Sequence, residues 1–190
     1  MISADLLIHA YKSGAFPMAT SEGAISWFSP DPRAVIPLDE HFHIPHGLAR
    51  TLRKSLFEIR IDTAFGEVMR GCAARPETWI NREILESYEN LHRLGYAHSV
   101  EAWKDGKLAG GLYGVAIAGA FFGESMFHTV TDASKAALVA LVNRLRERGY
   151  RVLDTQWNTP HLRTFGTCEI PRGIYLKLLG AALQKDCRFV

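Results

Sequence analysis

The sequence has few cysteines and little net charge, and each of these features excludes classes of protein. Cys72, Cys168 and Cys187 are far apart and odd in number, so they indicate neither a disulfide framework nor a zinc site. This cysteine usage favours a reducing cytoplasm. The net charge of +2 is too small for a protein that wraps long nucleic acid, but it permits contact with a few phosphates.

The sequence also lacks a long uninterrupted apolar run. The richest stretch, residues 108–127, contains glycines and Glu124, which indicates strands and turns and not a membrane span. The N-terminus, "MISADLLIHAYKSG", has acidic and polar breaks where a signal peptide needs apolar residues. With 190 residues, 47% of them apolar, and no internal repeat, we expect one compact core or a core with a small lobe.

The first part of the chain is richer in proline than the remainder. The stretches "AFPM", "FSPDPRAVIPL" and "HIPHG" hold five of the eight prolines, which predicts short strands and turns. We therefore expect a small N-terminal lobe over residues 1–45. Apolar spacing then predicts a helix within residues 63–75 and an amphipathic helix over residues 81–95 that ends at Gly95.

From residue 97 onward, the pattern predicts mixed strands and helices. We assign these, together with the helices that precede them, to an acetyltransferase-like domain over residues 46–190. The part from residue 97 consists of a hairpin with a turn at Asp105-Gly106, a third strand, a helix capped by Thr131 or Asp132, a strand over "YRVLDTQ" and a last helix. The order β-β-β-α-β-α is that of the acyl-CoA N-acetyltransferase core. We predict an α+β fold with a mixed acetyltransferase-like (GNAT-type) sheet and flanking helices, although order alone is only an analogy for function.

A CoA-dependent N-acetyltransferase is accordingly the alternative function. Such an enzyme needs a glycine-rich turn before the helix, where backbone N–H groups bind pyrophosphate. The corresponding stretch here, "SMFHTVTDASK", has no glycine and carries Asp132. A carboxylate at that position would repel phosphate, so we expect an acyl donor other than CoA.

Glu124 is the single carboxylate in the apolar run over residues 118–127. A buried glutamate without a partner is costly or gives up its charge. Two interpretations stay open: an internal Arg or Lys pairs with Glu124, or Glu124 recognises a cationic group of a ligand. The aromatic residues and the methionine around it suit the second.

Asp154 and Gln156, in "LDTQ", lie two residues apart at the end of a predicted strand and should share a face. An acid and an amide side by side can hold an amine. The alternative is an aspartate that fixes the adjoining loop through a local hydrogen bond.

Other charged clusters have simpler interpretations. The three histidines of "HFHIPH" lack a carboxylate or cysteine, so we predict a solvated loop and no metal site. A second cluster consists of the four basic residues Arg50, Arg53, Lys54 and Arg60. We expect these residues to form a solvated face, which could also contact phosphates.

Taken together, a series of segments resembles the leucyl/phenylalanyl-tRNA–protein transferase family. The segments run in the family's order from about residue 6 to residue 172, and the ordered set is highly specific, although single motifs are not. They are "AYKSGAFPM", "WFSPDPRAVIPL", "TWI", "HSVEAWKDGKLAGGLYGV", "FFGESMF", "DASKAAL", "LDTQ", "TPHL" and "FGTCEIPR".

The resemblance implies an aminoacyltransferase that moves Leu, Phe or sometimes Met from the 3′ end of aminoacyl-tRNA to the N-terminus of a protein. The acceptors begin with Arg or Lys, and the products enter N-end rule degradation. The resemblance also implies an acetyltransferase-like C-terminal domain and no need for metal, ATP or CoA. We expect a cytoplasmic protein, and we expect a monomer because no exposed apolar helix seam stands out.

The resemblance assigns roles to individual residues as well. The reaction centre would hold Asp154 and Gln156, and Glu124 would face the cationic N-terminal residue of the acceptor. Tyr88 would lie near the terminal adenosine. The apolar pocket for the donor side chain would be formed by Trp27, Trp79, Leu112 and Met126.

The sequence departs from the family pattern at a few positions. Leu112 stands where other members have Met, and Thr155 stands where many have Cys. Longer members carry an additional N-terminal segment, so we expect a reduced first lobe here. A changed pocket wall would shift the preference among Leu, Phe and Met.

Overall fold

A seven-stranded mixed sheet forms the centre of the molecule, which a computed structural model describes over residues 1–190. Its strand order is β4-β5-β6-β7-β8-β3-β9, and all neighbours are antiparallel except β7 and β8. The bounds are β3 (Arg33–Ile36), β4 (Glu58–Ile61), β5 (Ala97–Lys104), β6 (Lys107–Ile117), β7 (Ala120–His128), β8 (Val152–Gln156) and β9 (Cys168–Ile170).

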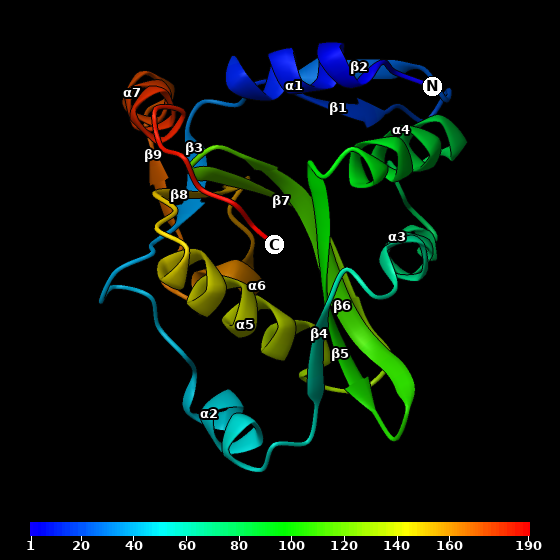
Figure 1. Cartoon of the computed structure of the whole chain (residues 1–190), viewed down its shortest axis with the longest axis vertical. Helices are drawn as coiled ribbons and strands as arrows, with labels where there is room; N and C mark the ends of the chain where they lie inside the picture. Colours follow the sequence, from blue (N-terminus) through cyan, green and yellow to red (C-terminus); the bar gives the residue numbers. More distant parts are fainter.

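Helices cover both faces of this sheet (Figure 1). One face carries α3 (Phe65–Ala73) and α4 (Arg82–Arg93), and the other carries α5 (Ala133–Glu147). The remaining elements are α1 (Ala4–Lys12), β1 (Phe16–Ala19), β2 (Ile25–Phe28), α2 (His46–Arg53), α6 (Pro160–Arg163) and α7 (Arg172–Ala182). The order β5-β6-β7-α5-β8, with β7 parallel to β8, confirms the predicted α+β fold with an acetyltransferase-like sheet.

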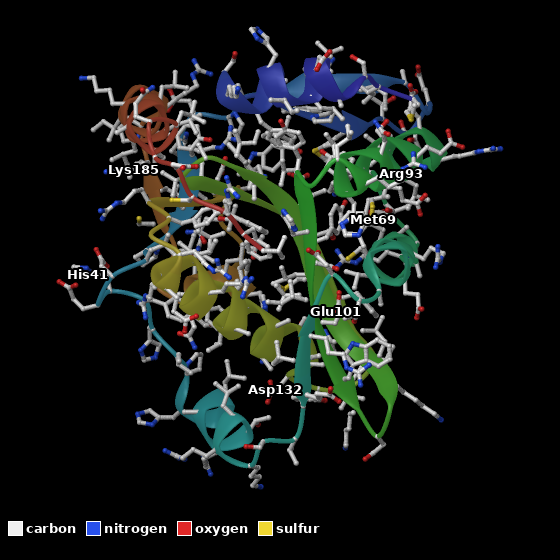
Figure 2. All side chains as sticks on the ribbon, in the orientation of Figure 1. His41, Met69, Arg93, Glu101, Asp132 and Lys185 are labelled. Atoms are coloured by element: carbon white, nitrogen blue, oxygen red, sulfur yellow. The ribbon has the colours of Figure 1, made fainter.

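Each face of the sheet has its own apolar core, and side chains fill the space under the helices (Figure 2). The first core joins α1, α3, α4 and α7, with Met69 of α3 fully buried in it. The second core lies beneath α5 and includes Leu138, Leu141, Val142 and Leu145 of that helix. The two cores therefore lie on opposite sides of strands β6 and β7.

Local signals predicted several elements correctly. Asn81 caps α4 by accepting a hydrogen bond from the Ile84 N–H at 2.9 Å. Gly95 comes after that helix with φ 79°, the left-handed conformation in which glycine commonly ends helices. The β5–β6 hairpin turns at Asp105-Gly106, with φ values of 51° and 73° that suit the twist of the two strands.

The expected cap of α5 is only half right. Asp132 occupies the N-cap position but has φ 69° and makes no side-chain cap bond. Its carboxylate instead accepts hydrogen bonds from Lys135 Nζ at 2.9 Å and from Thr51 Oγ1 of α2 at 3.0 Å. The charge-assisted bond from Lys135 and the bond from Thr51 of α2 thus take the place of the expected bond between the Asp132 side chain and a backbone N–H of α5.

The N-terminal region contains a helix that the proline pattern did not predict. Ser3 caps α1 by accepting a hydrogen bond from the Leu6 N–H, ahead of the first proline at residue 17. The β1–β2 hairpin comes next, but β3 lies in the large sheet between β8 and β9. The division of the chain at residue 45 stays a prediction. No helix of the molecule is both long and apolar enough to cross a membrane.

Candidate active site

The parallel strands β7 and β8 pair only over a short length and then separate. Residues 120–122 pair with residues 152–154, but beyond this point β7 continues along β6 to His128 while β8 ends at Gln156. A cavity of about 780 Å³ lies at this separation, lined by residues of both strands. A break between parallel strands is a frequent place for a binding site.

The cavity contacts both apolar cores, so it has two sides. On the α3 side, the lining residues belong to the first core or pack against it. They are Phe16, Met18, Trp79, Tyr113 and Phe127. On the α5 side, the lining residues are aliphatic and belong to the second core or pack against it. They are Leu112, Met126, Leu138, Leu141 and Leu153. Polar side chains of Glu124 and Gln156 lie at the junction of the strands.

Glu124 reaches the cavity because β7 has a bulge there. Tyr113 pairs with Ser125 and Gly114 pairs with Gly123, so Glu124 is the additional residue between them. A bulge of this kind redirects a side chain and is common beside active sites. The carboxylate accepts hydrogen bonds from the Tyr11 hydroxyl at 2.7 Å and from the Tyr88 hydroxyl at 3.5 Å.

No Arg or Lys pairs with Glu124, which removes the first of the two interpretations drawn from the sequence. Burial raises the pKa of Glu124 to about 8, and the negative charge of Asp154 adds to the rise. The hydrogen bond from Tyr11 and the charge of Arg33 oppose it. At neutral pH this carboxyl group is mostly protonated, and a cation entering the cavity would favour its ionised form.

Gln156 is the other polar group at the junction. It has φ 60° at the end of β8 and is 6% exposed. Its Nε2 lies 3.5 Å from Glu124 Oε1. The side-chain amide therefore lines the cavity beside the carboxyl group.

Asp154 supports this arrangement from behind the cavity wall. It is fully buried, and Arg33 donates to both of its oxygens, from Nε at 2.9 Å and from Nη2 at 2.7 Å. The Tyr175 hydroxyl donates to Oδ2 at 2.6 Å. The backbone N–H of Gln156 donates to Oδ1 at 2.9 Å. Asp154 does not line the cavity, and it holds the backbone that carries Gln156.

Arg33 was not among the residues that the sequence pattern singled out. It is fully buried, donates to the carbonyl oxygen of Gly14 at 2.9 Å, and lies over the rings of Phe16 and Tyr175. The sequence did offer a signal for Arg33, because it is a charged residue directly before the apolar "AVI", just as Glu124 is a charged residue within an apolar run. Tyr11 and Tyr175 carried no comparable signal, because tyrosine is common in amphipathic helices.

The residues predicted for the donor pocket divide into two groups. Trp79, Leu112 and Met126 line the cavity. Trp27 does not line it, and its side chain on β2 is 41% exposed. Met18, across the same hairpin on β1, does line the cavity. The sequence pattern did not predict Met18 or Trp157 as lining residues.

Tyr88 is fully buried and does not line the cavity. Its hydroxyl contacts Tyr11 and Glu124. The expected contact between Tyr88 and adenosine stays a prediction, and the structure gives Tyr88 a place in the support of Glu124.

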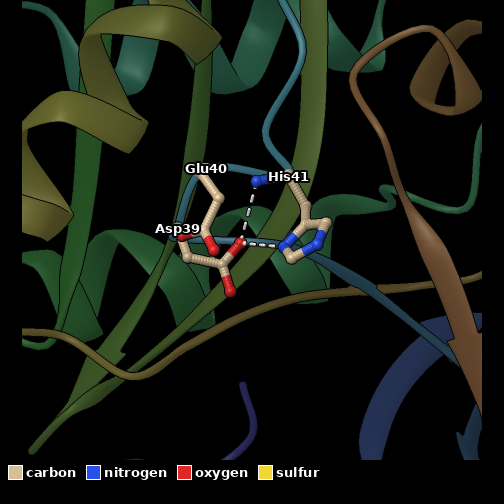
Figure 3. A group of neighbouring side chains, drawn as sticks. All are labelled: Asp39, Glu40 and His41. Carbon is tan, nitrogen blue, oxygen red and sulfur yellow. Dashed lines mark hydrogen bonds and ion pairs between the residues drawn. The ribbon is translucent and has the colours of Figure 1, made fainter.

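A separate group of ionisable side chains lies in the loop after β3 (Figure 3). The backbone N–H of His41 donates to Asp39 Oδ1 at 3.0 Å, and His41 Nδ1 lies 3.0 Å from the same oxygen. Glu40 is close to both, and all three residues are exposed. Local hydrogen bonding accounts for this arrangement, and we assign no metal to it.

Comparison with known proteins decides the family. The model of the leucyl/phenylalanyl-tRNA protein transferase family matches residues 35–180, and the model of its N-terminal domain matches residues 1–31. The chain belongs to the leucyl/phenylalanyl-tRNA–protein transferase family. As a member of this family, it is an aminoacyltransferase.

Relatives from this family match nearly the whole chain. A leucyl/phenylalanyl-tRNA–protein transferase of Herpetosiphon aurantiacus is 57% identical, over 99% of this chain and 98% of that one. The transferase of Akkermansia muciniphila is also 57% identical, over 97% of this chain and 98% of that one.

Among solved structures, a ribosomal-protein-alanine N-acetyltransferase from Brucella melitensis biovar Abortus 2308 matches with a TM-score of 0.41 and 18% identity. It covers 58% of this chain and 84% of that chain. The acetyltransferase-like fold of this family member rests on its own strand order and strand directions. Membership in the transferase family also sets aside the CoA-dependent alternative.

Proposed function

We propose that the chain transfers Leu or Phe, and also Met, from aminoacyl-tRNA to the α-amine of proteins that begin with Arg or Lys. It would act as a cytoplasmic monomer, and its products would enter N-end rule degradation. The observation that carries this proposal is the cavity between β7 and β8, which places an aliphatic surface beside a carboxyl group that has no cationic partner.

The donor side chain would occupy the α5 side of the cavity. That side is lined by Leu112, Met126, Leu138, Leu141 and Leu153. A methylene group in such a pocket is worth about 1–3 kcal/mol, enough to favour a large apolar side chain over a small one. Side chains branched at Cβ would be rejected by shape.

The acceptor would bind on the side of Glu124. A cationic first residue gives this carboxyl group the positive partner that the fold lacks. Binding would therefore lower the pKa of Glu124 from about 8 and release a proton. Trp79 and Met18 supply apolar surface for the rest of the first residue.

The reaction requires no nucleophile from the enzyme, because the aminoacyl ester is already activated. The neutral α-amine attacks the ester carbonyl, the C–N bond forms, the bond to the ribose oxygen breaks, and that oxygen takes the proton lost by the amine. Gln156 would orient the reacting groups. Holding amine and ester together can contribute up to roughly 7–11 kcal/mol to lowering the barrier.

Asp154 would act through Gln156 and not as a base at the reacting atoms. Each of its oxygens accepts two hydrogen bonds, from Arg33 and Gln156 or from Arg33 and Tyr175. This geometry supports a positioning role.

A transfer assay tests the proposal. Radiolabelled Leu-tRNA, Phe-tRNA or acetyl-CoA is offered with a peptide that begins with Arg, and a matched peptide with an acetylated N-terminus is the control. We expect label from both aminoacyl-tRNAs only in the free peptide. Labelling from acetyl-CoA alone, or no dependence on the free amine, would contradict the proposal.

A further inference from the structure

Tyr113 carries a buried hydroxyl group that has no hydrogen-bond partner. The side chain lies on β6 with 0% exposure, and its OH contacts no donor or acceptor of the protein. Nearly all buried polar groups in native proteins are paired, so an exception calls for an explanation. Tyr113 also lines the cavity between β7 and β8. Tyr113 is therefore a lining residue whose hydroxyl has no partner within the protein, and a ligand in the cavity could supply one.

The position of the ring is set by its neighbours. The ring of Tyr113 packs edge-to-face against Tyr88, with centroids 5.8 Å apart, and against Phe65 at 5.9 Å. Its backbone pairs with Ser125 in the middle of the sheet. The hydroxyl cannot turn toward another part of the fold without disturbing these contacts.

Tyr113 and the pocket proposed for the donor side chain lie on opposite sides of the sheet, so the donor side chain is not the partner of the hydroxyl. Successive residues of a strand face opposite sides of a sheet, and Leu112 belongs to the second core while Tyr113 belongs to the first. The aliphatic α5 side, proposed for the donor, is thus across the sheet. Ser125, the partner of Tyr113 on β7, comes directly after Glu124.

Charge on this side of the cavity favours a cation as the ligand. Burial, and then the negative charge of Glu124, raise the pKa of Tyr113, and the charge of Arg75 opposes this rise more weakly. The hydroxyl therefore stays neutral and can accept a hydrogen bond. The only arginine or lysine that lines the cavity is Arg75, which is exposed and donates to the carbonyl oxygen of Met126. Arg75 therefore lies at the mouth, while Tyr113 is in the buried wall.

We propose that the Tyr113 hydroxyl is a second recognition group of the acceptor site, which accepts a hydrogen bond from the guanidinium of an acceptor beginning with Arg while Glu124 binds the same guanidinium. This inference rests on the proposed function and deepens it. A guanidinium presents several N–H groups in a plane and can bind two acceptors at once, whereas an ammonium is a compact point charge on a flexible chain. Tyr113 would thus favour Arg over Lys.

The test is Tyr113→Phe, which removes the hydroxyl and keeps the ring. Tyr150→Phe is the matched control, because Tyr150 is also buried but does not line the cavity. Transfer to peptides that differ only in a first residue of Arg or Lys is measured as separate kcat and KM values. Thermal unfolding of each variant is recorded alongside.

We expect Tyr113→Phe to raise KM for the Arg peptide roughly 10- to 100-fold with little change in kcat, and to raise KM for the Lys peptide less. The melting temperature should stay equal or rise, since an unpaired buried hydroxyl is removed. Tyr150→Phe should leave both KM values unchanged. Equal KM values for wild type and Tyr113→Phe, or an equal rise for Arg and Lys peptides, would overturn the inference.

A binding measurement separates this inference from the proposed function. Argininamide and lysinamide are titrated into wild type and Tyr113→Phe without any donor, so the result does not depend on transfer. Weaker binding of argininamide to the variant supports the role of Tyr113 even if wild type transfers nothing to these peptides. Unchanged binding contradicts that role even if transfer proceeds.

Discussion

At the scale of single residues, the site depends on two carboxyl groups, Asp154 and Glu124, that the fold treats differently. Arg33 and Asp154 satisfy one another with two hydrogen bonds of 2.9 and 2.7 Å, and removal of one partner from such a pair usually destabilises a protein strongly. Glu124 is left with hydroxyl and amide donors only. The paired residues hold the site in place, and the unpaired one stays available to a ligand.

We predict that Glu124 makes the free protein less stable as the pH rises from about 5 to 8. The pKa of Glu124 is about 8 in the folded protein and about 4.3 in an unfolded chain. Between these values the folded state keeps a proton that the unfolded state has lost, so the stability due to this group is full below the unfolded pKa and declines toward pH 8.

Urea unfolding of wild type and Glu124→Gln at pH 5.5, 7 and 8.5 checks this sign. The free energy of unfolding of wild type should fall relative to the variant as the pH rises. Glu77→Gln, which changes an exposed carboxylate outside the cavity, should run parallel to wild type. A parallel course for Glu124→Gln would contradict the raised pKa.

At the scale of elements, the bulge in β7 and the separation of β7 from β8 create the cavity. Beside the bulge, the two strands approach each other closely. Gly114 of β6 lies opposite Gly123 of β7, next to Glu124. A Cβ atom at Gly114 would overlap with the carbonyl oxygen of Phe122 and with the ring of Phe121. Glycine is therefore the residue that lets β6 and β7 pair next to the bulge.

We predict that Gly114→Ala costs about 1–3 kcal/mol of stability, as overpacking does in cores, and lowers transfer activity by shifting Glu124. Gly180→Ala is the control, because a Cβ atom at Gly180 in α7 meets nothing within 4 Å and alanine favours helix. Denaturant unfolding and the transfer assay measure both effects. A Gly114→Ala protein as stable and active as wild type would show that the strands adjust without cost.

At the scale of the whole molecule, the charge distribution matches a shallow contact with tRNA. The net charge is only +2, and Arg75 is the only arginine or lysine in the cavity lining. Its exposed position at the mouth suits a phosphate group of the terminal nucleotides. A cavity for the esterified amino acid with a single arginine in its lining would limit recognition to the end of the tRNA.

We predict that Arg75→Ala raises KM for aminoacyl-tRNA and lowers the slope of log KM against log salt by about 0.7, the value for one phosphate contact of a single strand. With an aminoacyl-adenosine that lacks phosphate groups as the donor, the variant should match wild type. Arg70→Ala, on the same face of the sheet but outside the cavity lining, is the control. An equal loss with both donors would indicate a structural role for Arg75.

Much of the fold was accessible from local patterns in the sequence. The amphipathic helix α4, the β5–β6 hairpin, the third strand, α5 and β8 all carry periodicity, caps or turn residues that act over a few neighbours. Glu124 and Gln156 were recognisable as polar residues in apolar strands or at a strand end. These signals need no knowledge of distant segments.

The partners of those residues could not be obtained in the same way. Arg33 meets Asp154 across 121 positions, and Tyr11 meets Glu124 across 113. Asp154 and Gln156 were expected to share one role at the strand end, but the positive φ of Gln156 and the position of β3 leave only Gln156 in the cavity. Such pairings depend on which strand lies next to which.

By itself, the sequence determined the class of fold, the order of the elements and the family, because periodicity, turns and ordered motifs are local properties of the chain. Only the tertiary structure decided that the internal arginine pairs with Asp154 and leaves Glu124 without a cation. That outcome depends on β3 lying beside β8 and on β7 bulging at one residue, and these arrangements arise when segments far apart in the sequence pack into one sheet.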